Sequence, residues 1–290
     1  MKYKLLQLLL IIVPAIVYAQ NPDSIWAKKH YIKKEQYIKM RDGVRLFTAI
    51  YMPVDLPGKH PILMARTPYS CAPYGKEWLP SFWNNYLGAY LRRGYCFVLQ
   101  DVRGRYMSEG TFVNIRPFKP NKKTNKDIDE ASDTYDTIDW LIKNIPNNNG
   151  KVGVLGVSYP GFYAAMAALS QHPALKAVLP EAPVTDWFMG DDLHHNGAFQ
   201  LEDAFAFYYQ YSFGAPRPKP KSTPDKEIPQ PEYDSYKYFL NVGPLPEFTK
   251  LIGDSIAFWK ELMAHLITMP GGKQGMTAST CRAFRLIFPH

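Results

Sequence analysis

The chain has 290 residues, of which 46% are hydrophobic and 21% are charged, and its formal net charge is +8. This composition excludes a largely disordered protein, because disordered chains combine low hydrophobicity with a high fraction of charge. The basic residues gather in loops such as 119–126 and 216–226, and not on a face interleaved with aromatic residues. We therefore expect no nucleic-acid partner.

The first 19 residues have the pattern of a secretory signal peptide. Lys2 and Lys4 precede an apolar run over residues 5–17, and Val17 and Ala19 place small residues at a cleavage site. We predict cleavage after Ala19, a secreted or periplasmic protein and no stable membrane anchor after cleavage. The alternative is an uncleaved anchor, for which the run is short.

From residue 20 to residue 186 the pattern alternates between apolar strands and amphipathic helices. Short apolar strands that alternate with helices are typical of an α/β domain with a mainly parallel sheet. Asp42-Gly43 marks a hairpin between the first two strands. The predicted order is strands at 37–53 and 60–67, a helix at 77–94, a strand at 95–101, a helix at 127–145, a strand at 151–158, a helix at 160–172 and a strand at 175–184.

Two different segments follow this domain. Residues 187–265 are rich in aromatic residues and helical in pattern, with no clear strand, which predicts a helical cap over the sheet. Residues 266–290 contain no Asp or Glu and show no periodicity, so they form an atypical tail.

Ser158 lies where a strand changes into a helix. Gly156 and Val157 end the strand, Pro160 opens the helix, and a serine at such a turn presents its hydroxyl above the sheet. The backbone N–H of Tyr159, at the helix start, can face an oxyanion. The usual pattern is G-x-S-x-G, and here the last glycine comes one position late. The alternative is an ordinary turn serine.

Cysteine and metal-ligand patterns are sparse. Cys71, Cys96 and Cys281 are too few for a disulfide scaffold, although one bridge stays open. No C-x-x-C or H-E-x-x-H spacing occurs, so we expect neither a metal nor a cofactor.

Four motifs occur together in one order along the chain. They are RTPYS (66–70), QDVRGRYMSEG (100–110), GVSYPGF (156–162) and MGDDLHHNGAF (189–199). With them the chain resembles the X-Pro dipeptidyl-peptidase/cocaine-esterase superfamily (peptidase S15-like, CocE/NonD hydrolases), and within it most closely the α-amino-acid ester hydrolases. The resemblance implies an α/β-hydrolase fold with a helical cap, a C-terminal jelly-roll domain and a Ser–Asp–His triad.

The resemblance also implies roles for single residues. Ser158 matches the nucleophile, and the Tyr69 hydroxyl beside the Tyr159 N–H matches the oxyanion hole. Asp192 matches a carboxylate that binds the α-ammonium group of the substrate. Without the resemblance, Tyr69 would be interpreted as a packing aromatic and Asp192 as a helix cap or solvated acid.

Three residues of the second motif are expected to be structural. Asp101 ends a strand and can tie down the loop that follows, and Arg103 and Gly104 belong to that loop.

The acid and base of the implied triad follow the cap in chain order, and the sequence reaches neither motif. The last strands of the sheet and the jelly-roll domain are expected to be missing for the same reason. We hypothesise a truncated reading of a longer gene, with a frameshift after residue 265. The cap, helix-end and terminal histidines are expected to be surface or packing residues: His172, His194, His195, His265 and His290.

The sequence therefore predicts a secreted serine hydrolase that cleaves acyl esters or amides through an acyl-enzyme and is impaired by the absent triad residues. Its partner would be a small acyl ester, amide or short peptide. Two alternatives stay open: an X-Pro dipeptidyl-peptidase, and a catalytically inactive fragment or binding module.

Overall fold

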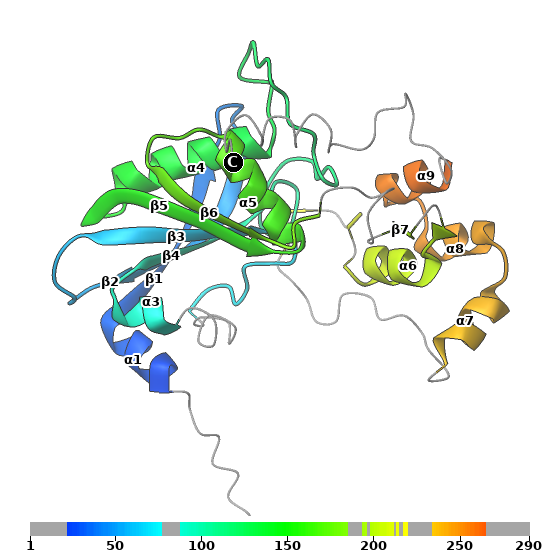
Figure 1. The fold of residues 1–290 in the computed structure, drawn as a ribbon, viewed down its shortest axis with the longest axis horizontal. Coiled ribbons are helices and arrows are strands. Elements are labelled where there is room, and N and C mark those ends of the chain that lie inside the picture. The colour runs from blue at the N-terminus through cyan, green and yellow to red at the C-terminus, as the bar shows by residue number, and fades with distance from the viewer. Residues whose placement is uncertain are drawn as a thin grey trace, which may run out of the picture.

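The computed structural model describes residues 22–76, 88–184, 193–195, 198–211, 213–214, 217–219 and 234–264. We call the described part of 22–184 the α/β core and the described part of 193–264 the cap. Figure 1 shows the core as a twisted sheet flanked by helices, with the cap helices gathered beyond the ends of the central strands.

A mixed six-stranded sheet forms the α/β core. Its strand order is β1 (Tyr31–Lys39), β2 (Arg45–Pro53), β4 (Cys96–Asp101), β3 (His60–Thr67), β5 (Asn148–Val157) and β6 (Leu175–Glu181). The pairs β1–β2 and β2–β4 are antiparallel, and the other three pairs are parallel. This confirms the prediction of a mainly parallel sheet.

The start of the sheet differs from the prediction in one respect. Gly43, with φ +94°, makes the predicted hairpin turn between β1 and β2. Strand β1 begins at Tyr31, six residues earlier than predicted, and helix α1 (Pro22–His30) precedes it. The strand was predicted to begin too late because the first part of β1 is a charged run. An edge strand does not need an apolar sequence.

Helices α4 (Glu130–Asn144) and α5 (Tyr159–Leu169) cover one face of the sheet, and α1 and α3 (Gly88–Arg92) cover the other. Helix α4 begins at a capping box in which Asp129 and Ser132 bind each other's backbone N–H groups. The predicted helix at 77–94 overlaps α3, and its residues 77–87 lie outside the described residues.

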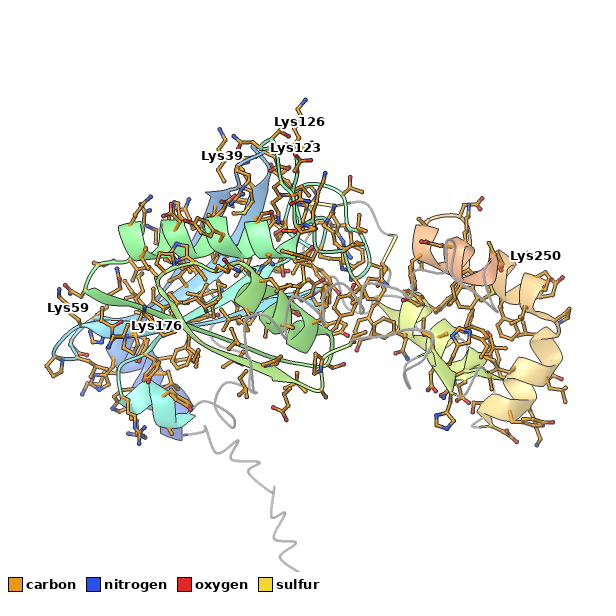
Figure 2. The ribbon with its side chains drawn as sticks, turned by 45° about the horizontal axis from the view of Figure 1, so that its top comes forward. Lys39, Lys59, Lys123, Lys126, Lys176 and Lys250 are labelled. Atoms are coloured by element: carbon orange, nitrogen blue, oxygen red, sulfur yellow. The ribbon has the colours of Figure 1, made fainter. Side chains whose placement is uncertain are left out.

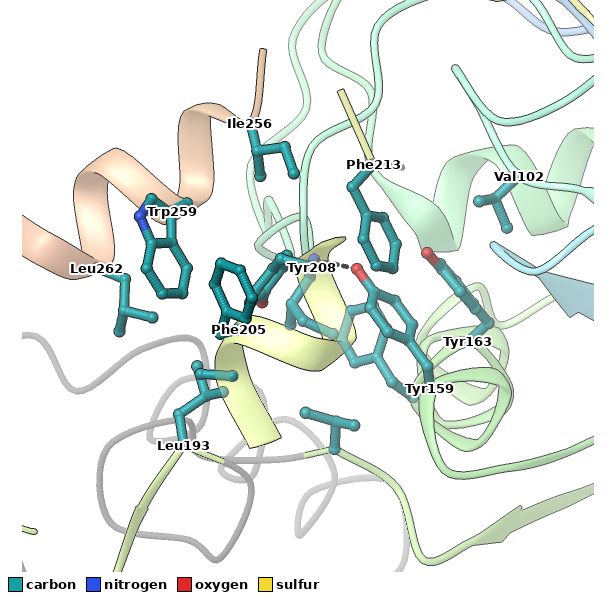
Figure 3. Packing of buried hydrophobic residues seen from close by; sticks show 14 of the residues in the cluster. Val102, Tyr159, Tyr163, Leu193, Phe205, Tyr208, Phe213, Ile256, Trp259 and Leu262 are labelled. Carbon is teal, nitrogen blue, oxygen red and sulfur yellow. Dashed lines mark hydrogen bonds between the residues drawn. The ribbon is translucent and has the colours of Figure 1, made fainter. Parts of the chain in front are cut away.

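The cap consists of helices α6 (Leu201–Gln210), α7 (Ser235–Val242), α8 (Leu245–Ile252) and α9 (Ala257–Ala264). The two-residue strands β7 (His194–His195) and β8 (Ala198–Phe199) form a small hairpin that was not predicted. Figure 3 shows how the cap packs on the core: in the cap, Phe205 lies beside Trp259, and Tyr208 contacts Phe213, which in turn stacks near the Tyr159 ring of α5.

Several sequence predictions fall on residues that the structure does not describe: the signal peptide, Asp192, Cys281 and the tail.

Cys71 and Cys96 are both buried free thiols. In the described ranges, none of the helices combines the length and the apolar character needed to cross a bilayer.

Basic side chains point into solvent from separate places on the molecule. In Figure 2, Lys39, Lys123 and Lys126 extend at the top, Lys59 and Lys176 lie at the left, and Lys250 lies on the cap. These labelled lysines therefore do not share one face.

Candidate active site at the end of strand β5

Ser158 occupies the sharp turn between β5 and α5. Its φ of 62° and ψ of −123° are rare for a residue other than glycine. Its N–H donates to the carbonyl of Glu181 (2.9 Å), and its own carbonyl accepts from the N–H of Phe162 (3.1 Å). The backbone is thus fixed on both sides while the side chain is exposed, and such strain costs about 1–3 kcal/mol.

Two glycines make this turn sterically feasible. A Cβ atom at Gly156 would overlap the carbonyl group of Pro160, and a Cβ atom at Gly161 would lie 2.5 Å from the carbonyl oxygen of Glu181 on β6. The glycine that comes one position late in the sequence pattern is therefore required, because it lets α5 approach the edge strand closely.

Tyr69 lies beside this turn, in the loop 68–76 that follows β3; we call this segment the Tyr69 loop. Its ring meets the Tyr159 ring edge-on at 6.1 Å between centroids. The same ring also packs against Tyr211 at 4.6 Å and Phe207 at 6.3 Å. The structure thus brings Tyr69 to the residue that follows Ser158, at the junction between core and cap.

The buried carboxylate of Asp101 binds the Tyr69 loop through hydrogen bonds. One carboxylate oxygen accepts from the Cys71 N–H (2.7 Å), and the other accepts from the Tyr74 hydroxyl (2.9 Å) and the Met107 N–H (3.1 Å). Burial raises the pKa of Asp101 to about 6. The prediction that Asp101 ties down the following loop is confirmed, and its hold on the Tyr69 loop is a role that sequence reasoning missed.

The Tyr159 side chain is a packing element. Its hydroxyl donates to the side-chain oxygen of Asn114 (2.9 Å) and accepts from the Ile115 N–H (2.8 Å), as Figure 3 shows in part. The residue is fully buried, and burial raises the pKa of the phenol. Any contribution of Tyr159 to chemistry therefore belongs to its backbone N–H, which begins α5, and the first N–H groups of a helix have no acceptor within it.

A buried network of charges fixes the ends of β3 and β4 that lead to the site. Arg66 donates to the Gln100 side chain (2.8 Å) and pairs with Glu130 (3.1 Å). Arg103 pairs with Asp133 (2.7 Å) and with Asp42 (2.7 Å). Arg103 is thus structural, as predicted. The network was not foreseen as a whole, because its members are spread over some ninety positions.

Of the histidines expected to be surface or packing residues, His172 and His194 are buried and His195 is exposed. The His172 ring accepts from the Ala174 N–H (3.1 Å) and packs on Tyr135 (4.5 Å), and burial lowers its pKa. His194 is buried against Phe199. Among the described residues, no side chain hydrogen-bonds the Ser158 hydroxyl, and His265 and His290 lie outside them.

Asp192 lies outside the described residues, so the structure does not relate it to Ser158. In the same described ranges, no three His, Cys, Asp or Glu side chains form a cluster that could hold a metal ion.

The strand order and the serine turn after β5 define the class of this protein: it is an α/β-hydrolase. Residues 42–262 match the family model described as X-Pro dipeptidyl-peptidase (S15 family), and the chain belongs to this family of hydrolases. The resemblance inferred from the four motifs is thereby confirmed.

Several similar proteins agree with this assignment. Cocaine esterase from Rhodococcus sp. (strain MB1 Bresler) is 33% identical over 171 residues, which cover 57% of this chain and 26% of that protein. The crystal structure of an aminopeptidase from a marine sediment Thaumarchaeota archaeon has a TM-score of 0.69 at 37% identity, covering 82% of this chain and 38% of that one. An α-amino acid ester hydrolase has a TM-score of 0.69 at 34% identity, covering 88% and 41%.

The chain is therefore shorter than these proteins. It spans 26% of the cocaine esterase and 38% and 41% of the two solved structures.

Proposed function

We propose that this protein is a secreted serine hydrolase that cleaves acyl ester or amide bonds through an acyl-enzyme at Ser158. The observation that carries the proposal is the exposed hydroxyl on a strained turn at the start of α5, with Tyr69 beside it. Strain of this kind is retained where the surrounding structure over-determines it, and it concentrates at active sites. Secretion rests on the sequence pattern of residues 1–19.

In the proposed reaction the Ser158 oxygen attacks the carbonyl carbon of the substrate and loses its proton to a base. The carbonyl π electrons move to the oxygen, which becomes an oxyanion. The Tyr69 hydroxyl and the Tyr159 N–H donate to this oxygen. The tetrahedral intermediate then collapses: the protonated base gives its proton to the leaving oxygen or nitrogen, which departs as an alcohol or amine. Water then attacks the acyl-enzyme with the same proton transfers, which releases the acid and restores the Ser158 hydroxyl.

The described residues do not supply a base for this reaction. No described residue hydrogen-bonds the Ser158 hydroxyl, and a serine hydroxyl without a base is a poor nucleophile at neutral pH. We therefore propose that the chain alone reacts slowly, at a rate set by the oxyanion hole and by substrate binding.

The substrate class follows from the motif that contains Asp192. A carboxylate beside the site would select a positively charged α-amino group through charge-assisted hydrogen bonds. The named α-amino acid ester hydrolase favours this class. The family description, and a putative Xaa-Pro dipeptidyl-peptidase of Bacillus anthracis that is 30% identical over 142 residues, favour X-Pro dipeptides as the second candidate.

A fluorophosphonate probe tests the nucleophile directly. We expect slow labelling at Ser158 that is abolished in Ser158→Ala and kept in the control Ser170→Ala, at the other end of α5. Tyr69→Phe is expected to slow labelling by roughly 10²–10³-fold, the usual effect of losing one oxyanion donor. A folded chain that does not label would instead support an inactive fragment or binding module.

Substrate comparison separates the two enzymatic candidates. Faster turnover of an α-amino acid ester than of an X-Pro anilide, with a rise in KM in Asp192→Asn, would support the ester hydrolase. The reverse preference would support the dipeptidyl-peptidase.

A further inference from the structure

Arg105 is a buried arginine that neither the proposed reaction nor the buried charge network uses. It lies in the loop after β4, and its side chain is completely buried. Its Nε donates to the carbonyl of Pro68 (2.8 Å), and its Nη2 donates to the carbonyl of Tyr211 (2.7 Å). One guanidinium thus bonds to the backbone of two segments that are far apart in the sequence.

Both acceptors lie next to the candidate site. Pro68 directly precedes Tyr69, and Tyr211 is the residue that ends helix α6 of the cap. The rings of Tyr69 and Tyr211 pack on each other at 4.6 Å. The backbone bonds of Arg105 and this ring contact therefore join the Tyr69 loop to α6 at the same point.

The surroundings of Arg105 hold its guanidinium in one orientation. Its central carbon lies 4.5 Å from the ring centroid of Phe213, 4.8 Å from that of Tyr106 and 5.4 Å from that of Phe112. Burial among these rings lowers the pKa of Arg105 and strengthens its hydrogen bonds, because water does not compete for the carbonyls. A lysine could not reproduce the arrangement, since its ammonium is neither planar nor forked.

We propose that Arg105 is a positioning residue that couples cap helix α6 to the Tyr69 loop, so that the cap sets the place of the Tyr69 hydroxyl. The catalytic consequence rests on the proposed function, because it requires Tyr69 to be an oxyanion donor. The mechanical coupling does not, because it depends only on the two carbonyl contacts and the ring packing.

Hydrogen exchange on the full chain tests the coupling without any catalysis. Arg105→Lys is expected to raise amide exchange in residues 68–76 and 201–211 together, by roughly ten- to hundredfold, as expected for lost hydrogen bonds to a charged group. The control is Arg116→Lys, an arginine of the same loop that donates to the carbonyl of Thr111 and pairs with Glu130, so that its described bonds reach neither segment; it should leave both segments unchanged. A rise in one segment only, or an equal rise along the whole chain, would overturn the proposal.

A second variant covers the case in which Arg105→Lys does not fold. Phe213→Leu keeps the guanidinium and removes the ring that lies closest to it. Exchange should then rise by a few-fold in the same two segments, because the guanidinium is less well held. A rise restricted to the cap would count against the coupling.

A double-mutant cycle separates positioning from general stabilisation. Arg105→Lys is expected to slow fluorophosphonate labelling of Ser158 by about tenfold in the wild-type background and to have no further effect in Tyr69→Phe, where the positioned hydroxyl is gone. Equal slowing in both backgrounds would overturn the positioning role. If the wild-type chain does not label at all, the proposed hydrolase fails, while the exchange measurements still decide the coupling.

Discussion

The α/β core around the candidate site and the cap are stabilised by different kinds of contact. Around the candidate site, the core uses buried charges with fixed directions: Arg66 and Arg103 are at most 4% exposed and bind acids of α4 and the first hairpin. The cap uses rings. Phe205 contacts Phe239, Phe248 and Trp259 at 5.1–6.0 Å, and the described ion pairs of the cap helices lie on the surface.

This difference has a functional meaning. Hydrogen-bonded charges depend steeply on distance and angle, so they keep the loops beside Ser158 in one geometry. Apolar burial is not directional, so a ring-packed cap can shift or be replaced at modest cost. A core with fixed loops beneath an adaptable cap suits an enzyme family whose members differ in substrate, and Arg105 lies where the two kinds of packing meet.

Removing a charge from the core network is expected to have the largest effect. Asp133→Asn should lower the free energy of unfolding by about 3–5 kcal/mol, because it removes the charge of one of the two carboxylates, each 2.7 Å away, that neutralise the buried Arg103. Urea denaturation measures the loss. The control Asp139→Asn changes a partly exposed acid of the same helix, which pairs with Lys143 on the surface, and should cost at most about 1 kcal/mol. Equal losses in both variants would contradict the importance of the buried network.

Asp101 should make the stability of the folded chain fall as the pH rises from about 4 to about 6. Its pKa is about 6 in the folded state against 3.8 as the ordinary value, so the folded chain binds the proton more tightly between these limits. The contribution of Asp101 to stability is therefore greatest below pH 4, falls by about 3 kcal/mol as pH rises to 6, and is constant above.

Asp101→Asn should remove this fall, which urea denaturation at several pH values can measure. Asp127→Asn is an opposite control: ion pairing with Lys119 lowers the pKa of Asp127, so that acid stabilises the fold only as pH rises. An unchanged slope in Asp101→Asn would contradict the assignment.

Substituting one aromatic residue of the cap is expected to lower the stability by less than the changes in the core. Trp259→Phe keeps an aromatic group but removes the Nε1–H bond to the Thr249 hydroxyl (3.1 Å) and part of a fully buried surface. We expect a loss of about 2 kcal/mol, seen by hydrogen exchange in α6, α8 and α9 and not in the sheet. Faster exchange in β3 and β5 would show that the cap and the core unfold as one unit.

The smallest expected effect is a gain in stability. Ser158→Gly should relieve the strain at φ 62° and stabilise the chain by about 1 kcal/mol, because glycine adopts positive φ without cost while losing more entropy on folding. Ser170→Gly, at φ −67°, should destabilise by a similar amount. Thermal unfolding of the two variants compares them. A loss of stability in Ser158→Gly would mean that the turn holds no strain.

The sequence predicted those parts of the molecule that depend on neighbouring residues. The Asp42-Gly43 turn, the apolar strands and the serine between Gly156 and Pro160 each carry a local signal, and β1–β2, β5 and α5 follow from them. The polar edge strand β1 was placed too short, and the β7–β8 hairpin was missed, because two-residue strands have no periodicity.

What only the tertiary structure decided is which distant groups meet around Ser158. The sequence by itself determined the alternation of strands and helices, the sharp turn and the resemblance to a hydrolase family, since these depend on backbone sterics and on apolar patterns over a few residues. It could not show that Asp101 holds the Tyr69 loop or that Arg105 bonds to both Pro68 and Tyr211. Such contacts arise when the parallel strands bring their carboxyl ends to one edge, and no local pattern records which loops will share that edge.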